Sequence, residues 1–213
     1  MSPIIVIGGG GHGRVVIDEL LRGGATLFGV IDPDCRVAAQ LPGSVPWLGG
    51  DDVLASYPPA HYRLANGIGG IGEPQRRRAF ETFRQAGYAF AAVQHPSAII
   101  ASSSVVLGEG CQIMAGAVVQ SGALIGTDAI VNTRAAVDHD CVVGDHSHVA
   151  PGVVLCGGVV VGDDTHVGAG AVVIQGIRIG RGCIIGANAT VLRDVPDGTI
   201  MFARGERHEA SRR

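Results

Sequence analysis

The second half of the chain carries a six-residue hydrophobic period. From Leu107 to Val191, every sixth residue is a branched aliphatic, and fifteen such positions follow one another without an insertion. The residue two places earlier is usually small, as at Ala117 and Ala123. Because residues two apart on a strand face the same way, both side chains point inward. Three units form one triangular coil, so the pattern predicts a left-handed parallel β-helix of hexapeptide repeats over residues 96–198.

Residues 1–95 follow a different pattern, in which short apolar runs alternate with helical periodicity. We expect strands at 3–7, 27–31, 63–68 and 90–94, and helices at 12–21 and 73–86. Residues 40–62 contain four prolines and receive no element. A βαβ order of this kind predicts a small parallel sheet, here an α/β half-Rossmann-like domain. Residues 199–213 follow the last repeat and are expected to form a C-terminal tail.

The first expected strand runs into the glycine-rich segment GGGGHG, which fits G-x-G-x-x-G and opens the first expected helix. Glycines there let the backbone approach a pyrophosphate at the helix N-terminus, and an acidic residue ends the next strand. Three uses are open: a nucleotide-sugar site, an NAD site, or a loop with a structural role only. Because 95 residues are too few for a complete NAD domain, we favour the nucleotide-sugar. The expected substrate-binding residues are Gly8, Gly10, Gly11, His12, Gly13 and Asp32. His12 fits a diphosphate contact and an exposed helix start equally well.

Composition narrows the possible functions. The formal net charge is −3, which argues against nucleic acid as the main partner. All 16 basic residues are arginine, so lysine Schiff-base chemistry and a P-loop are excluded. No apolar run reaches the length of a membrane span, and no basic segment precedes the first apolar run, so neither membrane insertion nor secretion is expected. Five cysteines without a CxxC pair fit a cytoplasmic protein.

Two histidines of the repeat are candidates for chemistry. His139 is expected at a corner of the coil, where Asp140 can orient its imidazole as a general base. His148 lies between two inward positions and therefore points outward. The two are nine residues apart, half of an 18-residue coil, so they lie on opposite sides of one prism. They can share a site only between two chains, which predicts a homo-oligomer, and a triangular prism suggests a homotrimer.

A zinc site would leave the first domain unexplained, so no metal is expected. The remaining histidines are expected to be solvated surface residues: His61, His95, His146, His166 and His208.

Taken together, the glycine loop, the acidic residue Asp32, the hexapeptide run and the segment N-T-x5-H-D-C-x2-G-x3-H-x-A-P-G, from Asn132 to Gly152, resemble one family. It comprises the bacterial sugar acetyltransferases related to the PglD and NeuD proteins. The resemblance covers about residues 3–198. It implies a trimer whose N-terminal domain binds a nucleotide-linked amino sugar and whose β-helices hold acetyl-CoA between subunits.

The resemblance also implies roles for individual residues. His139 would deprotonate the sugar amine and Asp140, which is often Glu in the family, would orient it. His148 would lie near the acetyl-CoA thioester, the Gly157 N–H would stabilise the oxyanion, and Asn132 would contact the sugar. The last residues, 199–213, lack the proline of the G-x-P-A segment that family members place near CoA, so contacts there are not carried over.

The sequence therefore predicts an acetyl-CoA-dependent N-acetyltransferase. Its expected acceptor is a nucleotide-linked amino sugar such as a UDP-4-amino-4,6-dideoxy sugar, although the sugar, its nucleotide and the pathway stay open. The amine would attack the thioester directly, because Cys141 occupies an inward position and cannot act as a nucleophile. One alternative is O-acetylation of a sialic-acid-like sugar. A second is a non-catalytic trimeric scaffold that binds nucleotide-sugars.

Overall fold

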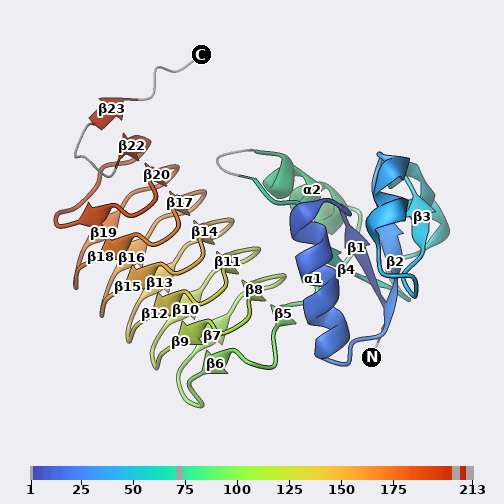
Figure 1. The fold of residues 1–213 in the computed structure, drawn as a ribbon, viewed down its shortest axis with the longest axis horizontal. Helices are drawn as coiled ribbons and strands as arrows, with labels where there is room; N and C mark the ends of the chain where they lie inside the picture. Colours follow the sequence, from blue (N-terminus) through green and yellow to red (C-terminus); the bar gives the residue numbers. More distant parts are fainter. Residues whose placement is uncertain (1, 71–73, 203–206, 210–213) are drawn as a thin grey trace. The chain divides into compact units, whose positions relative to one another are not determined.

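The computed structural model describes residues 2–70, 74–202 and 207–209. The chain forms two compact units, Met1–Pro96 and Ser97–Arg213 (Figure 1). Among the described residues, no helix combines the length and the apolar character that a membrane crossing requires.

The first unit is built on a four-stranded parallel sheet with the strand order β3-β2-β1-β4. Its strands are β1 (Ile4–Ile7), β2 (Leu27–Ile31), β3 (Trp47–Gly49) and β4 (Arg63–Asn66). Helix α1 (Gly11–Arg22) follows β1, and α2 (Pro74–Gln85) follows β4. Two 3-10 segments, η1 (Cys35–Gln40) and η2 (Asp51–Ser56), flank β3, and β5 (Val93–Gln94) lies near the end of the unit. The carboxyl ends of β1, β2 and β3 therefore lie side by side at one edge of the sheet.

Most elements expected in this unit are present, with two differences. Only residues 93–94 of the expected strand 90–94 form a strand, although Phe90 makes a single bridge to Leu64. The segment 40–62, which received no element, contains β3 and η2. Edge strand β3 has three residues, too few to show an alternating pattern.

The second unit is the predicted left-handed parallel β-helix, whose two-residue strands stack in three sheets (Figure 1). The first face consists of β7 (Val106–Leu107), β10 (Leu124–Ile125), β13 (Val142–Val143), β16 (Val160–Val161) and β19 (Arg178–Ile179). The second face consists of β8 (Gln112–Ile113), β11 (Ile130–Val131), β14 (His148–Val149), β17 (His166–Val167), β20 (Ile184–Ile185) and β22 (Thr199–Met201). The third face consists of β6 (Ile99–Ile100), β9 (Val118–Val119), β12 (Ala136–Val137), β15 (Val154–Leu155), β18 (Val172–Val173) and β21 (Thr190–Val191).

Successive strands on one face are 18 residues apart, as in the pairing of Leu124 with Val142 and of Val142 with Val160. Strand β22 continues the second face into the segment expected to be a tail, and β23 (Arg207–Glu209) pairs antiparallel with it. The rest of that segment, residues 203–206 and 210–213, lies outside the described residues.

The interior of the β-helix is filled by the periodic residues, as predicted. All fifteen aliphatics of the period are buried except Leu107 in the first coil, which is half-buried. Their small partners are also buried, including Ala117, Ala135 and Cys141, each fully inaccessible. Alternating small and branched side chains fill a narrow prism without aromatic rings, which explains the low aromatic content of the chain.

Each corner of the coil contains one residue in the left-handed region. From Ser104 to Asn188, every sixth residue has a positive φ, and eight of these are glycine. The glycines that directly follow the aliphatics have a different cause. A Cβ on Gly144 would lie 2.6 Å from the backbone N of Asp163 in the next coil, so glycine is needed there for close stacking of coils.

We expect Ile179→Ala to lower the free energy of unfolding by about 2–5 kcal/mol, because it removes buried methyl groups and leaves a cavity. Ile179 is 2% exposed. The neighbouring Arg178→Ala on the same strand is the control, since its side chain points outward and its loss should change stability by about 0.5 kcal/mol or less. Urea unfolding of both variants measures the difference. Equal effects would contradict the inward assignment.

Candidate functional site

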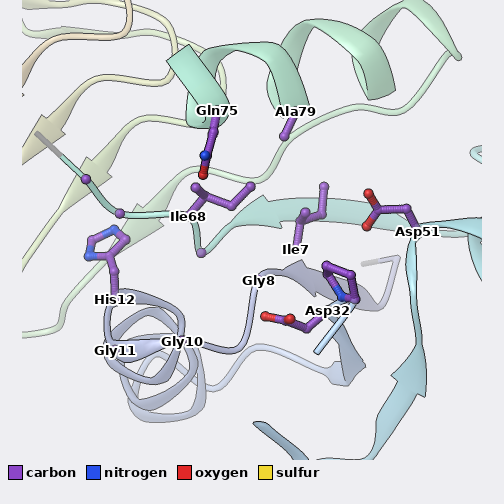
Figure 2. Close-up of a pocket in the computed structure, with 14 residues that line it drawn as sticks. Ile7, Gly8, Gly10, Gly11, His12, Asp32, Asp51, Ile68, Gln75 and Ala79 are labelled. Carbon is purple, nitrogen blue, oxygen red and sulfur yellow. The ribbon is translucent and has the colours of Figure 1, made fainter. Parts of the chain in front are cut away.

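A cavity of about 600 Å³ lies at the carboxyl edge of the sheet in the first unit (Figure 2). The glycine loop after β1 forms one side of it, and Ile68 and α2 lie opposite. Five of the predicted substrate-binding residues line it, namely Gly8, Gly10, Gly11, His12 and Asp32. No side chain caps the start of α1, so its first backbone N–H groups are available to an anion in this cavity.

Asp32 lines the cavity, but its carboxylate already has protein partners. One oxygen accepts a hydrogen bond from the Gly9 N–H at 2.7 Å, and the other accepts one from the Asp34 N–H at 2.8 Å. The carboxylate thus ties the glycine loop to the end of β2. These hydrogen bonds give Asp32 a role in holding the loop, and its predicted contact to ribose or base stays a prediction.

Gly13 is not among the residues that line the cavity, and its predicted contact with substrate stays a prediction. A Cβ on Gly13 would lie 2.0 Å from the Gly8 carbonyl oxygen. Glycine is therefore required for the close packing of α1 against the loop. The third glycine of the motif therefore allows α1 to pack closely against the loop.

His139 lies at the corner between the third and first faces, in the turn between β12 and β13. Its Nδ1 lies 2.8 Å from Asp140 Oδ2, and both side chains are exposed. Asp140 adopts a φ of 58°, which directs its short side chain back to the imidazole. The hydrogen bond to Asp140, helped by the charge of Asp138, raises the pKa of His139 above its ordinary value. With Nδ1 facing the carboxylate, Nε2 is the nitrogen free to accept a proton.

Gly157 lies against the imidazole from the next coil. A Cβ at this position would meet His139 Nε2 at 2.5 Å. Any side chain there would displace the ring, so glycine keeps Nε2 accessible. The predicted residue pair His139 and Gly157 is thus brought together by the 18-residue stacking of the coils.

His148 lies on β14 in the second face and contacts Asn132. The Asn132 Nδ2 donates to His148 Nε2 at 2.9 Å, while Asn132 Oδ1 accepts from the Thr133 N–H at 2.7 Å. This arrangement fixes the orientation of both side chains and makes Nε2 of His148 the acceptor. The rings of His148 and His166 meet edge to face, with centroids 4.9 Å apart.

His139 and His148 lie on opposite sides of the prism, as their spacing predicted. The corner between the third and first faces is the one opposite the second face, which carries His148. Within one chain these two histidines therefore cannot contact one substrate.

Two of the other histidines are not the solvated surface residues that the sequence predicted. The His166 side chain is buried on β17, and the His146 side chain is 11% exposed, with Nδ1 3.0 Å from the buried Asp128 carboxylate. His166 lies between the inward Thr165 and Val167, and His146 lies at a corner of the coil, but neighbouring groups cover both side chains. His61 is exposed and His95 half-buried, and the His208 side chain lies outside the described residues.

Cys141 is fully buried, and its Sγ donates to the Cys156 carbonyl at 3.2 Å. Burial raises the pKa of its thiol, which suits a packing residue rather than a nucleophile. In the parts of the chain that the structure describes, no group of three His, Cys, Asp or Glu side chains is placed to hold a metal ion.

Sequence reasoning missed several residues that line the cavity, among them Asp51, Ile68, Gln75 and Ala79. Asp51 follows β3, which the sequence did not predict, and its position at the same sheet edge as Asp32 depends on the strand order. The sequence Gly-Gly-Asp-Asp at residues 49–52 could have indicated a loop after a strand. Without a predicted strand before it, this sequence could not be placed at the sheet edge.

Comparison with known proteins supports this architecture. The PglD N-terminal domain profile matches residues 3–82, and the bacterial transferase hexapeptide profile matches residues 158–193. No curated protein sequence matches the chain. The acetyltransferase domain of PglB from Neisseria gonorrhoeae is 32% identical with a TM-score of 0.87, covering 96% of this chain and 98% of that one. The chain belongs to the PglD/NeuD-related family of bacterial sugar acetyltransferases.

Two further structures place this acetyltransferase among proteins of the same architecture. PerB from Caulobacter crescentus, crystallised with CoA and GDP-perosamine, is 36% identical over 98% of both chains, with a TM-score of 0.87. WeeI from Acinetobacter baumannii is 27% identical, covering 96% of this chain and 98% of that one, with a TM-score of 0.83.

In this acetyltransferase, we expect Asp140→Asn to lower the pKa of His139, because the variant removes the carboxylate that stabilises the imidazolium. Asparagine tolerates the left-handed backbone at this position, so the turn should be preserved. Asp138→Asn serves as the comparison and should lower the pKa less, since Asp138 acts on the ring through its charge alone. NMR titration of the His139 ring measures both. An unchanged His139 pKa in Asp140→Asn would contradict the pairing.

Proposed function

We propose that this protein is an acetyl-CoA-dependent N-acetyltransferase that acylates the amine of a sugar linked to a nucleoside diphosphate. The observation that carries the proposal is the exposed His139, whose Nδ1 is hydrogen-bonded to Asp140 and whose Nε2 lies against Gly157. The cavity beside the uncapped start of α1 supports a diphosphate-linked acceptor. The complexes of PerB with CoA and GDP-perosamine, and of the PglB domain with acetyl-CoA, support the same assignment.

His139 acts as the general base in this proposal. A sugar amine attacks the thioester carbonyl of acetyl-CoA, forming the N–C bond while its proton passes to His139 Nε2. The tetrahedral intermediate then collapses, the C–S bond breaks, and the CoA thiolate takes up a proton. Gly157 lies against the imidazole, and its backbone N–H would stabilise the oxyanion.

The pH dependence follows from the raised pKa of His139. The base works in its neutral form, so the rate rises as pH increases through the pKa of this histidine. Because Asp140 raises that pKa, the rise occurs at higher pH than for an ordinary histidine. The same shift makes the neutral imidazole a stronger base toward an ammonium group.

We propose that the active form is a homotrimer with sites between subunits. The two faces that meet at the His139 corner carry outward aliphatic side chains. The exposed members are Ile99, Val154 and Val172 on the third face and Val106 and Leu124 on the first. A neighbouring chain that covers these columns would lie beside His139 and could supply the His148 and Asn132 pair from its opposite side.

The acceptor and the compartment remain predictions. The sequence favoured a UDP-linked 4-amino-4,6-dideoxy sugar, whereas PerB was crystallised with GDP-perosamine. All five cysteines are free thiols, which fits the predicted cytoplasmic location where acetyl-CoA and nucleotide-sugars are available.

We expect CoA thiol release from acetyl-CoA in the presence of nucleotide-linked amino sugars, with a loss of about 100-fold or more in His139→Ala because general base catalysis is removed. The panel should include GDP-, UDP- and dTDP-linked amino sugars and free sialic acid. Circular dichroism checks that the variant keeps its fold.

Release with sialic acid alone would replace the proposal with O-acetylation. Turnover that persists in His139→Ala would contradict the assignment of the base. No CoA thiol release with any member of the panel, with the acetyl-CoA supply verified, would favour a scaffold that binds nucleotide-sugars.

We expect two inactive chains to restore activity when they assemble together. His139→Ala and His148→Ala damage opposite sides of one prism, so a mixed trimer contains intact sites between complementary chains. Random assembly of equal amounts should give about a quarter of the wild-type activity. Co-expression with two affinity tags and light scattering of the purified mixture measure composition and activity. Absence of recovery in verified mixed trimers would place both histidines outside a shared site.

A further inference from the structure

The cavity of the first unit contains a carboxylate that has not been assigned a role. Asp51 begins η2, and Gly50 alone separates it from the end of β3. Figure 2 shows its carboxylate directed into the cavity beside Ile7, at the end away from His12. Within the part of the chain that the structure describes, the Asp51 carboxylate accepts no hydrogen bond. Asp32, by contrast, uses both oxygens on backbone N–H groups.

The strand order sets the distance between Asp51 and the glycine loop. The loop follows β1, Asp32 follows β2, and Asp51 follows β3, and these three strands are neighbours in the parallel sheet. Two spacings of about 4.8 Å separate β1 from β3, so the carboxyl edge spans roughly 10 Å from the start of α1 to Asp51. That is the length of a nucleoside whose phosphate lies at α1, with its ribose near Asp32 and its base against Asp51.

The chemistry of a carboxylate then selects among the bases. An ionised carboxylate only accepts hydrogen bonds, and it pairs best with two donors side by side. Guanine presents N1–H and the 2-amino group next to each other. Uracil and thymine present one N–H between two carbonyl oxygens, and adenine presents one amino group beside a ring acceptor. Each of these would place an acceptor against the negative charge.

The electrostatic surroundings of Asp51 also favour guanine. Burial and the nearby Asp32 and Asp52 carboxylates raise the pKa of Asp51, so the group lies in a negative environment. A neutral edge with two donors offsets that environment, whereas an acceptor edge adds to the repulsion.

We propose that Asp51 determines nucleotide specificity by accepting hydrogen bonds from guanine N1–H and its 2-amino group, so that the acceptor sugar is linked to GDP. This rests on the proposed function of the cavity as the nucleotide-sugar site. It replaces the UDP-linked acceptor that the sequence favoured.

Calorimetric titration with free nucleotides tests the proposal without any acetyl transfer. We expect GDP to bind the wild-type protein about 10- to 100-fold more tightly than UDP, dTDP or ADP, because charge-assisted hydrogen bonds to the base are lost with the others. Inosine diphosphate, which keeps N1–H and lacks the 2-amino group, should bind between GDP and UDP.

Asp51→Asn should weaken the binding of GDP by about 10- to 100-fold, since the amide offers one acceptor in place of two. It should not weaken the binding of UDP, because the neutral amide no longer repels the uracil carbonyl oxygens. Asp52→Asn is the matched control. It removes the neighbouring charge, but Asp52 does not line the cavity, so the preference for GDP should remain.

Three results would overturn the proposal: UDP or dTDP binding as tightly as GDP, inosine diphosphate binding as tightly as GDP, or Asp51→Asn weakening every nucleotide equally, as a ribose contact would. The outcome is separable from that of the enzyme assay. A GDP preference lost in Asp51→Asn supports the inference even if no acetyl transfer is found. Acetyl transfer to a UDP-linked sugar without a GDP preference keeps the function and rejects the role of Asp51.

Discussion

The parallel pairing of coils at an interval of 18 residues positions all the chemistry of the second unit. It places Gly157 directly over His139 and His166 directly over His148. The interval is maintained because each corner contains one left-handed residue, so every six-residue unit turns the chain through the same angle. Asp140 is one of these corner residues, and its backbone conformation brings the carboxylate to the imidazole. One inserted residue would move an inward side chain to the surface and separate these pairs.

This dependence explains why the second unit was predictable from sequence and the first only in part. The inward positions of the β-helix repeat with a fixed period, so each was identified from its neighbours alone. His139 and Asp140 are adjacent in the chain, and their contact needed no tertiary information. Strand β3 has no such period. Its place at the sheet edge depends on pairing with β2, and 15 residues separate the two strands in sequence. Asp51, which follows β3, was missed for that reason.

Residue identity was easier to predict than residue role. The glycine motif and Asp32 were recognised as a unit, yet Gly13 packs against the Gly8 carbonyl and Asp32 accepts hydrogen bonds from the loop. A sequence motif shows which residues occur together but does not show which backbone N–H groups face a given carboxylate. His146 and His166 illustrate the same limit, since a position at a corner or between two inward residues does not specify whether a neighbouring group covers it.

The electrostatics of the cavity bring these observations together. Among the described residues, no lysine or arginine lines it, and two aspartates do, although a diphosphate is negatively charged. In the proposed complex, the backbone N–H groups at the start of α1 would supply the positive potential for the phosphates. Asp32 is stabilised by the donors of Gly9 and Asp34, so its charge is already balanced. The Asp51 charge needs donors from the ligand itself. In the proposed complex, a base with two adjacent N–H groups would meet that need at the end of the cavity away from the phosphates, and affinity for the nucleotide would depend on which base it carries.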